Sequence, residues 1–209
     1  MLEITSLTKR YNYQLILNIP SLQLPQGIYW LKGENGSGKT TFLKMAAALI
    51  PFDGFIAVDG ISQKTAPLRY RQRISWAEAE PLYPGFLTGN ELIALYQKIR
   101  ESSPEESAAL VRRFGATSYI HNPIATYSAG MLKKLSLILA FTGASELNLV
   151  LLDEPFITLD AQACNQLAQL LLEHHQQGRS IILSSHQDPG PDLLPCCKEL
   201  VVDNKTVRC

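Results

Sequence analysis

Gly33-Glu-Asn-Gly-Ser-Gly-Lys-Thr40 is the stretch of sequence that decides the fold. It matches the pattern G-x-x-x-x-G-K-[ST]. The apolar run 28–31 precedes it, and residues 41–49 after it are rich in strong helix formers. A strand, a glycine-rich loop and a helix in this order predict a loop that binds phosphate groups. A purely structural glycine turn would not need Lys followed by Thr.

The residue types in this loop suit a polyphosphate. Glycines at positions 33, 36 and 38 let backbone N–H groups turn inward around a phosphate, and the N-terminus of the following helix adds partial positive charge. Lys39 is expected to reach the β and γ oxygens, and the Thr40 hydroxyl to coordinate Mg²⁺. The residues expected to contact the ligand here are Gly33, Asn35, Gly36, Ser37, Gly38, Lys39, Thr40 and Thr41.

A second motif is Leu149-Val-Leu-Leu-Asp-Glu-Pro155, an apolar strand pattern that ends in two carboxylates. Open α/β sheets bind ligands at the carboxyl ends of their strands, so Asp153 is expected to bind Mg²⁺ there. Glu154 is expected to point away from Asp153 and to orient a water molecule against the γ-phosphate. By itself an acidic pair after an apolar run is a weak signal, and together with the glycine-rich loop it becomes a strong one.

Length and composition indicate one globular domain: 209 residues, 23.2 kDa, 46% hydrophobic and 18% charged. The 19 basic and 19 acidic residues give no net charge, so nothing draws the whole chain to nucleic acid or an anionic membrane. Neither an apolar run of about 18 residues nor a secretory signal is found. Cysteines 164, 196, 197 and 209 lack metal-ligand spacing and fit a reducing compartment.

Short apolar runs that alternate with longer helical patterns predict an α/β fold around a mainly parallel sheet. Earlier runs, separated by Pro and Gly turns, predict an antiparallel β flank. Segment 88–121 is helical without an intervening strand, and Thr88 and Ser103 each fit a capping box, so helices should begin near Gly89 and Pro104. The expected core strands are 27–31, 74–77, 147–152 and 180–184, and the expected flanking strands are 2–5, 15–19 and 55–58.

The order of these motifs is similar to that of the nucleotide-binding domain of ATP-binding cassette (ABC) transporters, over essentially the whole chain. Thr126-Tyr-Ser-Ala-Gly-Met131 resembles the family's signature motif, LSGGQ, and precedes a helix with an apolar stripe. Ser128 is a good N-cap, and the free N–H groups after it form a second anion site. The resemblance implies that Ser128 and Gly130 grip the γ-phosphate bound to the opposite subunit. Taken alone, the segment could be an ordinary capped helix.

Three further residues match the family in chain order. Tyr11 resembles the aromatic residue that stacks on adenine, with Tyr13 as a rival. Asp160, the last residue of the D-loop-like segment 156–160, resembles the aspartate at the dimer seam. His186, just past a predicted strand, resembles the switch histidine that contacts the γ-phosphate.

Two departures from the family pattern stand out. In the signature, Ala129 replaces a glycine and adds a methyl group where backbone approaches phosphate, and Met131 replaces a glutamine. In the segment that resembles the Q-loop, Ala79 occupies the glutamine position, between Glu78 and Glu80. The usual metal contact is therefore either absent or supplied by one of these carboxylates, and a solvated acidic loop is the simpler alternative.

The resemblance implies ATP and Mg²⁺ as cofactors and a homo- or heterodimer that sandwiches two ATP molecules. Glu154, His186 and Lys39 would carry hydrolysis, which opens the dimer. The opening of the dimer is expected to act on a separate integral membrane permease. The chain would then be cytoplasmic and peripheral on the inner face of the membrane, and no nucleic-acid partner is expected. The chain resembles the small ATPases of the ABC-2 or haem-exporter-like group, with export the expected direction.

We expect a single ABC ATP-binding domain over residues 1–209: a RecA-like core with the β flank (1–87 and 133–209) and a helical subdomain (88–132) that ends in the signature motif. Two alternatives stay open: a catalytically weak subunit that scaffolds a heterodimer, and a soluble ABC-type ATPase without a transport role. The Q-loop and the helical insert are the expected coupling surface for the permease. Its apolar residues, which could equally be core, are Leu82, Tyr83, Phe86, Leu92 and Tyr96.

Overall fold

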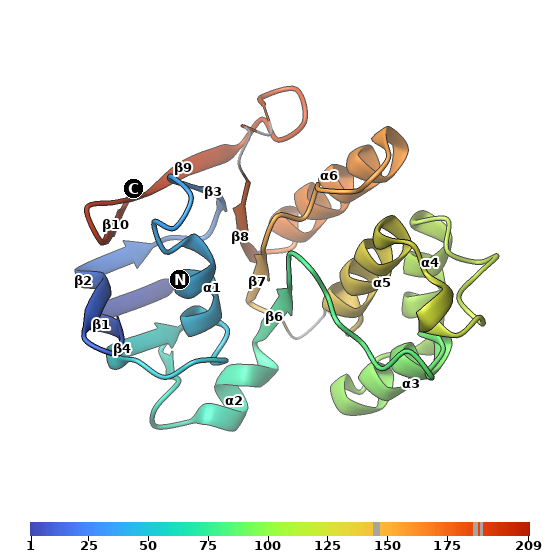
Figure 1. Ribbon diagram of the computed structural model, residues 1–209, viewed down its shortest axis with the longest axis horizontal. Coiled ribbons are helices and arrows are strands. Elements are labelled where there is room, and N and C mark those ends of the chain that lie inside the picture. Colours follow the sequence, from blue (N-terminus) through green and yellow to red (C-terminus); the bar gives the residue numbers. More distant parts are fainter. Residues whose placement is uncertain (144–146, 186–187, 189) are drawn as a thin grey trace.

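An antiparallel four-stranded sheet forms one side of the molecule, seen on the left of Figure 1. The structure is a computed structural model and describes residues 1–143, 147–185, 188 and 190–209. The first two strands extend beyond the predicted 2–5 and 15–19, because buried residues keep alternating with exposed ones along them. In spatial order the strands are β2 (Gln14–Leu24), β1 (Leu2–Tyr11), β4 (Asp53–Val58) and β5 (Ile61–Ser62).

A six-stranded sheet forms the centre of the molecule. Its inner strand pairs are parallel and only the edge pair β10 and β9 is antiparallel, which confirms the predicted α/β fold with a mainly parallel sheet. The predicted strands 74–77 and 180–184 agree with the observed bounds. The spatial order is β10 (Thr206–Arg208), β9 (Cys197–Asp203), β3 (Ile28–Lys32), β8 (Ser180–Ser184), β7 (Leu149–Leu152) and β6 (Ile74–Ala77).

The helical segment begins where the capping residues predicted. The Thr88 hydroxyl accepts from the Glu91 N–H at 3.2 Å while the Glu91 carboxylate accepts from the Thr88 N–H at 2.7 Å. The Ser103 hydroxyl accepts from the Glu106 N–H at 3.2 Å. The helices are α1 (Lys39–Ala46), α2 (Pro67–Gln72), α3 (Gly89–Arg100), α4 (Pro104–Arg113), the 3₁₀ turn η1 (Ile124–Thr126), α5 (Ala129–Phe141) and α6 (Ala161–Gln176).

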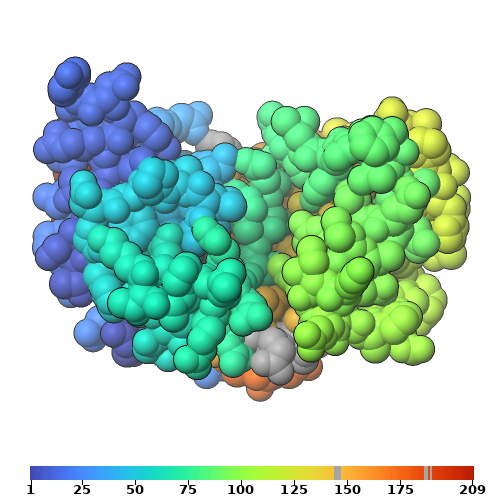
Figure 2. Space-filling view, turned by 90° about the horizontal axis from the view of Figure 1, so that it is seen from below, coloured from blue at the N-terminus to red at the C-terminus, as the bar shows by residue number. Residues whose placement is uncertain are grey.

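Two hydrophobic cores lie on the two faces of the six-stranded sheet. One fills the space between the two sheets and holds α1 through Phe42 and Leu43. The other packs α5 and α6 against the parallel strands and includes Leu135 and Leu167. In Figure 1, α3, α4 and α5 form a lobe on the side away from the antiparallel sheet, and Figure 2 shows the surface hollowed between this lobe and the N-terminal part. The proposed subdomain boundary at residue 132 falls within α5.

The helical lobe is anchored to the sheet by arginine. Arg100, at the end of α3, donates to the carbonyl oxygens of Ala140 (3.2 Å) and Thr142 (2.9 Å) and to the Ser75 hydroxyl (3.3 Å). Guanidinium groups suit such sites because their donors fan out in one plane. The bonds join α3 to the C-terminus of α5 and to β6, so the position of α5 relative to the sheet is fixed at that end.

His174 lies in α6 against Phe141, with 7% of its surface exposed. Burial, and then the charge of Arg179, lowers its pKa from 6.5 to about 4. Because the pKa in the folded state is below that in the unfolded state, the free energy of unfolding falls as pH drops from 6.5 towards 4. We expect the free energy of unfolding of His174→Gln, measured with denaturant, to change less with pH between 6.5 and 4 than that of the wild type. The exposed His121→Gln serves as control, and an unchanged slope in His174→Gln would contradict the assignment.

Candidate functional site

The glycine-rich loop joins β3 to α1 at the carboxyl edge of the six-stranded sheet. Gly36 has φ +77° and Gly38 has φ +108°, a backbone region that residues with side chains rarely adopt. Gly33 is needed for a different reason, because a Cβ atom there would lie 2.6 Å from the carbonyl oxygen of Val202. The buried Ser37 hydroxyl has no hydrogen-bond partner among the described residues. The loop thus presents backbone rather than bulky side chains, as an anion cradle requires.

Lys39 is the first residue of α1, and its ammonium is turned back over the loop. Nζ donates to the carbonyl oxygens of Gly33 at 2.7 Å and Glu34 at 3.0 Å. The side chain is nearly buried, with 8% exposed. A positive charge at the N-terminus of a helix, above a glycine-rich loop, is an arrangement that favours phosphate.

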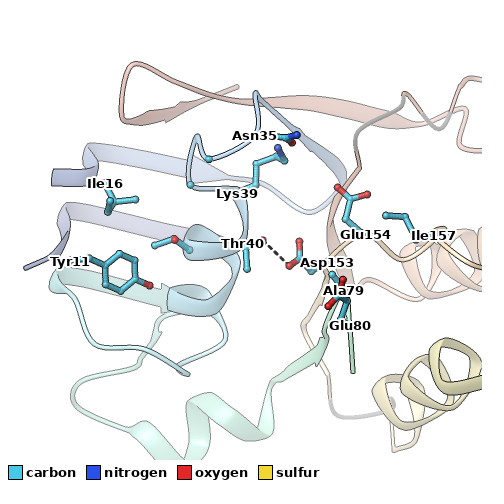
Figure 3. A pocket seen from close by; sticks show the side chains of 13 residues that line it. Tyr11, Ile16, Asn35, Lys39, Thr40, Ala79, Glu80, Asp153, Glu154 and Ile157 are labelled. Atoms are coloured by element: carbon cyan, nitrogen blue, oxygen red, sulfur yellow. Dashed lines mark hydrogen bonds between the residues drawn. The ribbon is translucent and has the colours of Figure 1, made fainter. Parts of the chain in front are cut away.

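Asp153 is a buried carboxylate at the end of β7. The Thr40 hydroxyl donates to its Oδ2 at 2.8 Å, drawn as the dashed line in Figure 3, and the Ser184 hydroxyl donates to its Oδ1 at 2.6 Å. Helix α1 and strand β8 therefore each hold one of its oxygens. Two hydroxyl donors leave further lone pairs on both oxygens, which can bind a cation.

Glu154 follows Asp153 in a left-handed backbone conformation. Its φ is +46°, a conformation that costs a residue with a side chain about 1 kcal/mol or more. The Glu154 N–H donates to the Ser184 hydroxyl at 2.9 Å, so one serine holds both acidic residues. Figure 3 shows the carboxylates of Asp153 and Glu154 pointing in different directions, with Glu154 across from Lys39.

A cavity of about 540 Å³ lies between the glycine-rich loop and these carboxylates, which is within the usual size of small-molecule sites. Tyr11, the predicted adenine-stacking residue, lines it, with the Lys9 ammonium 4.7 Å from its ring centroid. Tyr13 is 97% exposed. The lining consists of Tyr11, Ile16, Asn35, Gly36, Gly38, Lys39, Thr40, Thr41, Ala79, Glu80, Asp153, Glu154 and Ile157.

The groups around the cavity fit a nucleotide polyphosphate with a divalent cation. Lys39 and the start of α1 supply positive charge, and Thr40 and Asp153 supply hard oxygen ligands. Within the described ranges, no three His, Cys, Asp or Glu side chains form a metal-binding group. A cation would thus take its other oxygens from phosphates and water, as Mg²⁺ does in nucleotide sites. The predicted switch residue His186 lies outside the described residues.

The signature segment is partly exposed, with Tyr127 buried, and it lies outside the cavity lining. The Ser128 hydroxyl caps α5 by accepting from the Met131 N–H at 3.3 Å. Ser128 and Ala129 are exposed. A Cβ atom on Gly130 would lie 2.9 Å from the carbonyl oxygen of Thr158, so this position has no room for a side chain. The N-cap and the first residue of α5 are therefore exposed, whereas Gly130 lies close to the Thr158 backbone.

Asp160 caps α6 and pairs with the signature helix. Its carboxylate accepts from the Ala163 N–H at 2.8 Å and from the Lys134 ammonium at 2.6 Å. The hydrogen bond from Lys134, followed by that from the Ala163 N–H, lowers the pKa of Asp160. Ser128, Gly130 and Asp160 do not line the cavity between the glycine-rich loop and Asp153.

The structure gives different surroundings to Glu78 and Glu80, the two carboxylates between which the sequence left the choice open. Glu78 forms an ion pair with Lys44 on α1 at 2.6 Å. Glu80 lines the cavity beside Ala79. If a carboxylate replaces the family's glutamine at the nucleotide, the geometry favours Glu80.

The predicted coupling residues divide into two groups. Leu82 is 91% exposed and Phe86 is 83% exposed, so these two are available to a partner. Leu92 is buried, and Tyr83 and Tyr96 pack partly buried against the core of the helical lobe. Burial also raises the pKa of Tyr83 to about 12. Of the five apolar residues predicted for the coupling surface, only Leu82 and Phe86 are therefore well exposed.

Two buried polar residues were missed in the sequence. Ser184 ends the apolar strand β8, and a hydroxyl at the carboxyl end of a buried parallel strand was the available signal. Lys133 lies on the buried face of α5, four residues before Leu137, and its charge at a core position was the signal. Burial lowers the pKa of Lys133 to about 8, against the opposing effect of carboxylates led by Asp153.

The cavity between the glycine-rich loop and the two carboxylates suits a nucleoside polyphosphate, and comparison with known proteins specifies the family. The profile of the family described as "ABC transporter" matches residues 17–157. The cytochrome c biogenesis ATP-binding export protein CcmA of Legionella pneumophila is 31% identical over 190 residues, 90% of this chain and 94% of that protein. ATP-binding cassette sub-family A member 7 of Rattus norvegicus is 31% identical over 222 residues, 100% of this chain and 10% of that protein. A solved structure titled "Structure of ATP binding subunit of ABC transporter" has a TM-score of 0.89 at 26% identity, over 100% of this chain and 88% of that chain.

The chain belongs to the ABC transporter family. The share of each relative that this chain covers varies widely. It is about a tenth of the length of the sub-family A proteins of rat and human, and nearly the whole length of the Legionella protein. Within the described part of the chain, every helix is too short or too polar to cross a membrane.

Ser184→Ala tests the link between the two acidic residues. It would leave Oδ1 of Asp153 without this donor and the N–H of Glu154 without this acceptor, so we expect the free energy of unfolding to fall by about 1–3 kcal/mol and nucleotide affinity to weaken. Denaturant unfolding and nucleotide titration measure both. The control is Ser21→Ala at an exposed position of β2. A loss no larger than that of the control would contradict the assigned role.

Proposed function

We propose that this chain binds MgATP in the cavity and hydrolyses it to drive transport through a separate integral membrane permease. The observation that carries the proposal is the placement of Lys39 and Thr40 at the start of α1 opposite Asp153 and Glu154 at the end of β7. Phosphate-binding and acid–base groups thus face one cavity from two elements, at the sheet edge where α/β proteins bind ligands.

In the proposed complex the glycine-rich loop and Lys39 bind the phosphates, and Tyr11 stacks on the adenine. Thr40 and Asp153 hold Mg²⁺, which neutralises charge on the β- and γ-phosphates. Glu154, which lines the cavity, orients the attacking water. His186 and Lys39 stabilise the charge that develops on the γ-phosphate. The roles of Tyr11 and His186 rest on the resemblance to the family.

The second half of each proposed site comes from another ATP-binding subunit, either a copy of this chain or a related chain. Ser128 and the N–H groups at the start of α5 would bind the γ-phosphate held by the partner, with Gly130 allowing close approach. Asp160 would lie at the seam. The exposure of Ser128 and its absence from the cavity lining support this arrangement. Loss of the γ-phosphate would remove contacts between the copies and open the dimer.

The proposed permease docks on the segment after β6 and the helical lobe, where Leu82 and Phe86 are exposed. The chain would then be cytoplasmic and peripheral on the inner face of the membrane. The names of two relatives support a transport role: one is a cytochrome c biogenesis export protein, and another is the bacitracin transport protein BcrA of Enterococcus faecalis. The balance of 19 basic and 19 acidic residues gives no support to a nucleic-acid partner.

A second candidate is a catalytically weak subunit that binds ATP and scaffolds a heterodimer. The exposed Ala129 at the start of α5 favours it, since its methyl group stands where phosphate would approach. Ala79 also favours it, since it offers no side-chain ligand to the cavity. Turnover by the purified chain alone distinguishes the two candidates: MgATP-dependent phosphate release supports the first.

Glu154→Gln tests the catalytic assignment. An amide cannot accept a proton from water, so we expect phosphate release to fall by about 100-fold or more, while ATP binding persists and an ATP-stabilised dimer accumulates. Phosphate release and size-exclusion chromatography with MgATP measure the two effects. The exposed Glu105→Gln on α4 is the matched control. Turnover at the wild-type rate in Glu154→Gln would show that the role of Glu154 is wrong.

A further inference from the structure

Lys133 is a charged residue in the core of the molecule. It lies in α5, five residues after Ser128, and only 2% of its surface is exposed. Burying an ammonium group is unfavourable unless its donors are satisfied, so its partners show what holds it there.

All the acceptors near Nζ are backbone carbonyl oxygens at the ends of two strands. Nζ donates to the carbonyl oxygen of Ala79 at 2.6 Å and to that of Glu78 at 3.1 Å, both just past β6. The carbonyl oxygen of Asp153, just past β7, lies at 3.5 Å. The three N–H donors of a lysine thus meet three carbonyl groups. We call residues 78–80 the acidic loop.

Ala79 connects this cluster to the nucleotide cavity. Ala79 lines the cavity, and its carbonyl oxygen is the acceptor that lies nearest to the Lys133 ammonium. Glu80, the next residue, also lines the cavity. A ligand that presses on or draws in the acidic loop therefore displaces the groups that hold the Lys133 ammonium, and Lys133 is part of the helix whose first turn carries Ser128.

The link uses main-chain atoms, so it does not depend on which side chain stands at position 79. At the other end of α5, Arg100 binds the carbonyl oxygens of Ala140 and Thr142 and so holds that end of the helix to β6. The N-terminal half of α5 is held by Lys133, together with the half-exposed pair of Lys134 and Asp160. A surface ion pair contributes little, which leaves the buried lysine as the stronger attachment.

We propose that Lys133 is a positioning residue that couples occupancy of the nucleotide cavity to the orientation of α5, through the carbonyl groups of the acidic loop. The proposal rests on the proposed function, since it assumes that the cavity binds a nucleotide. Lys133 does not touch the nucleotide in this scheme; it carries a displacement from the acidic loop to the helix that presents Ser128.

Hydrogen exchange on the full chain with MgADP tests the proposal. MgADP is used because it lacks the γ-phosphate that would bridge two copies, and size-exclusion chromatography confirms the monomer. In the wild-type chain we expect amide exchange to slow by about threefold or more in two segments, 33–41 and 129–141. Lys133→Met should keep the slowing in 33–41 and lose it in 129–141. Lys133→Arg keeps charge and donors and should restore it.

Leu137→Ala is the matched control for a loss of stability. It removes fully buried contacts from the same helix but leaves the Lys133 link intact, so both segments should still slow. The proposal would be overturned if MgADP slowed amide exchange in 129–141 equally in Lys133→Met and in the wild type. It would also be overturned if MgADP did not slow exchange in 129–141 of the wild type. Lack of slowing in 33–41 of the wild type would instead show that the proposed nucleotide binding is wrong.

Discussion

Asp153 is the point at which three separate segments of the chain meet. Its two oxygens are held by Thr40 from the start of α1 and by Ser184 from the end of β8, and its backbone N–H donates to the Ala77 carbonyl oxygen at the end of β6. The strand order makes this possible, because β8 lies between β3 and β7 in the parallel sheet. The site therefore depends on the sheet being assembled in this order, and residues 113 positions apart become hydrogen-bonded neighbours.

The groups that line the cavity and the exposed start of the signature helix lie in different parts of the molecule. Groups that face the cavity come from the first two strands, the glycine-rich loop with the start of α1, and the segments after β6 and β7. Ser128 instead begins a helix on the other lobe and is exposed. Buried polar contacts between α5 and the sheet join the two parts of the molecule. They include Lys133, the Ser75 hydroxyl of β6, and Arg100 of α3, and all three donate to backbone carbonyl groups. Geometry set by main-chain atoms tolerates changes of side chain, including at Ala79, whose carbonyl oxygen accepts from Lys133.

The sequence was sufficient for the parallel sheet, for the helix starts at Gly89 and Pro104, and for the strand and helix on either side of the glycine-rich loop. Apolar periodicity, caps and glycine spacing are local signals. It was insufficient for contacts made between strands. Ser184 binds Asp153 and Glu154, which lie 31 and 30 positions before it in the chain. The choice between Glu78 and Glu80 depends on where Lys44 lies in space. The sequence also left Leu82 and Leu92 equivalent, and packing of the helical lobe buries one and exposes the other.

Glu154 illustrates a conflict between stability and activity. At φ +46° the backbone prefers glycine or asparagine, so glycine at this position would relieve strain and remove the carboxylate from the cavity. Selection for stability alone would therefore tend to erode this position. On the proposed role of Glu154, a chain released from the need to hydrolyse ATP should drift here early, and the residue at this turn would serve as a marker of retained turnover.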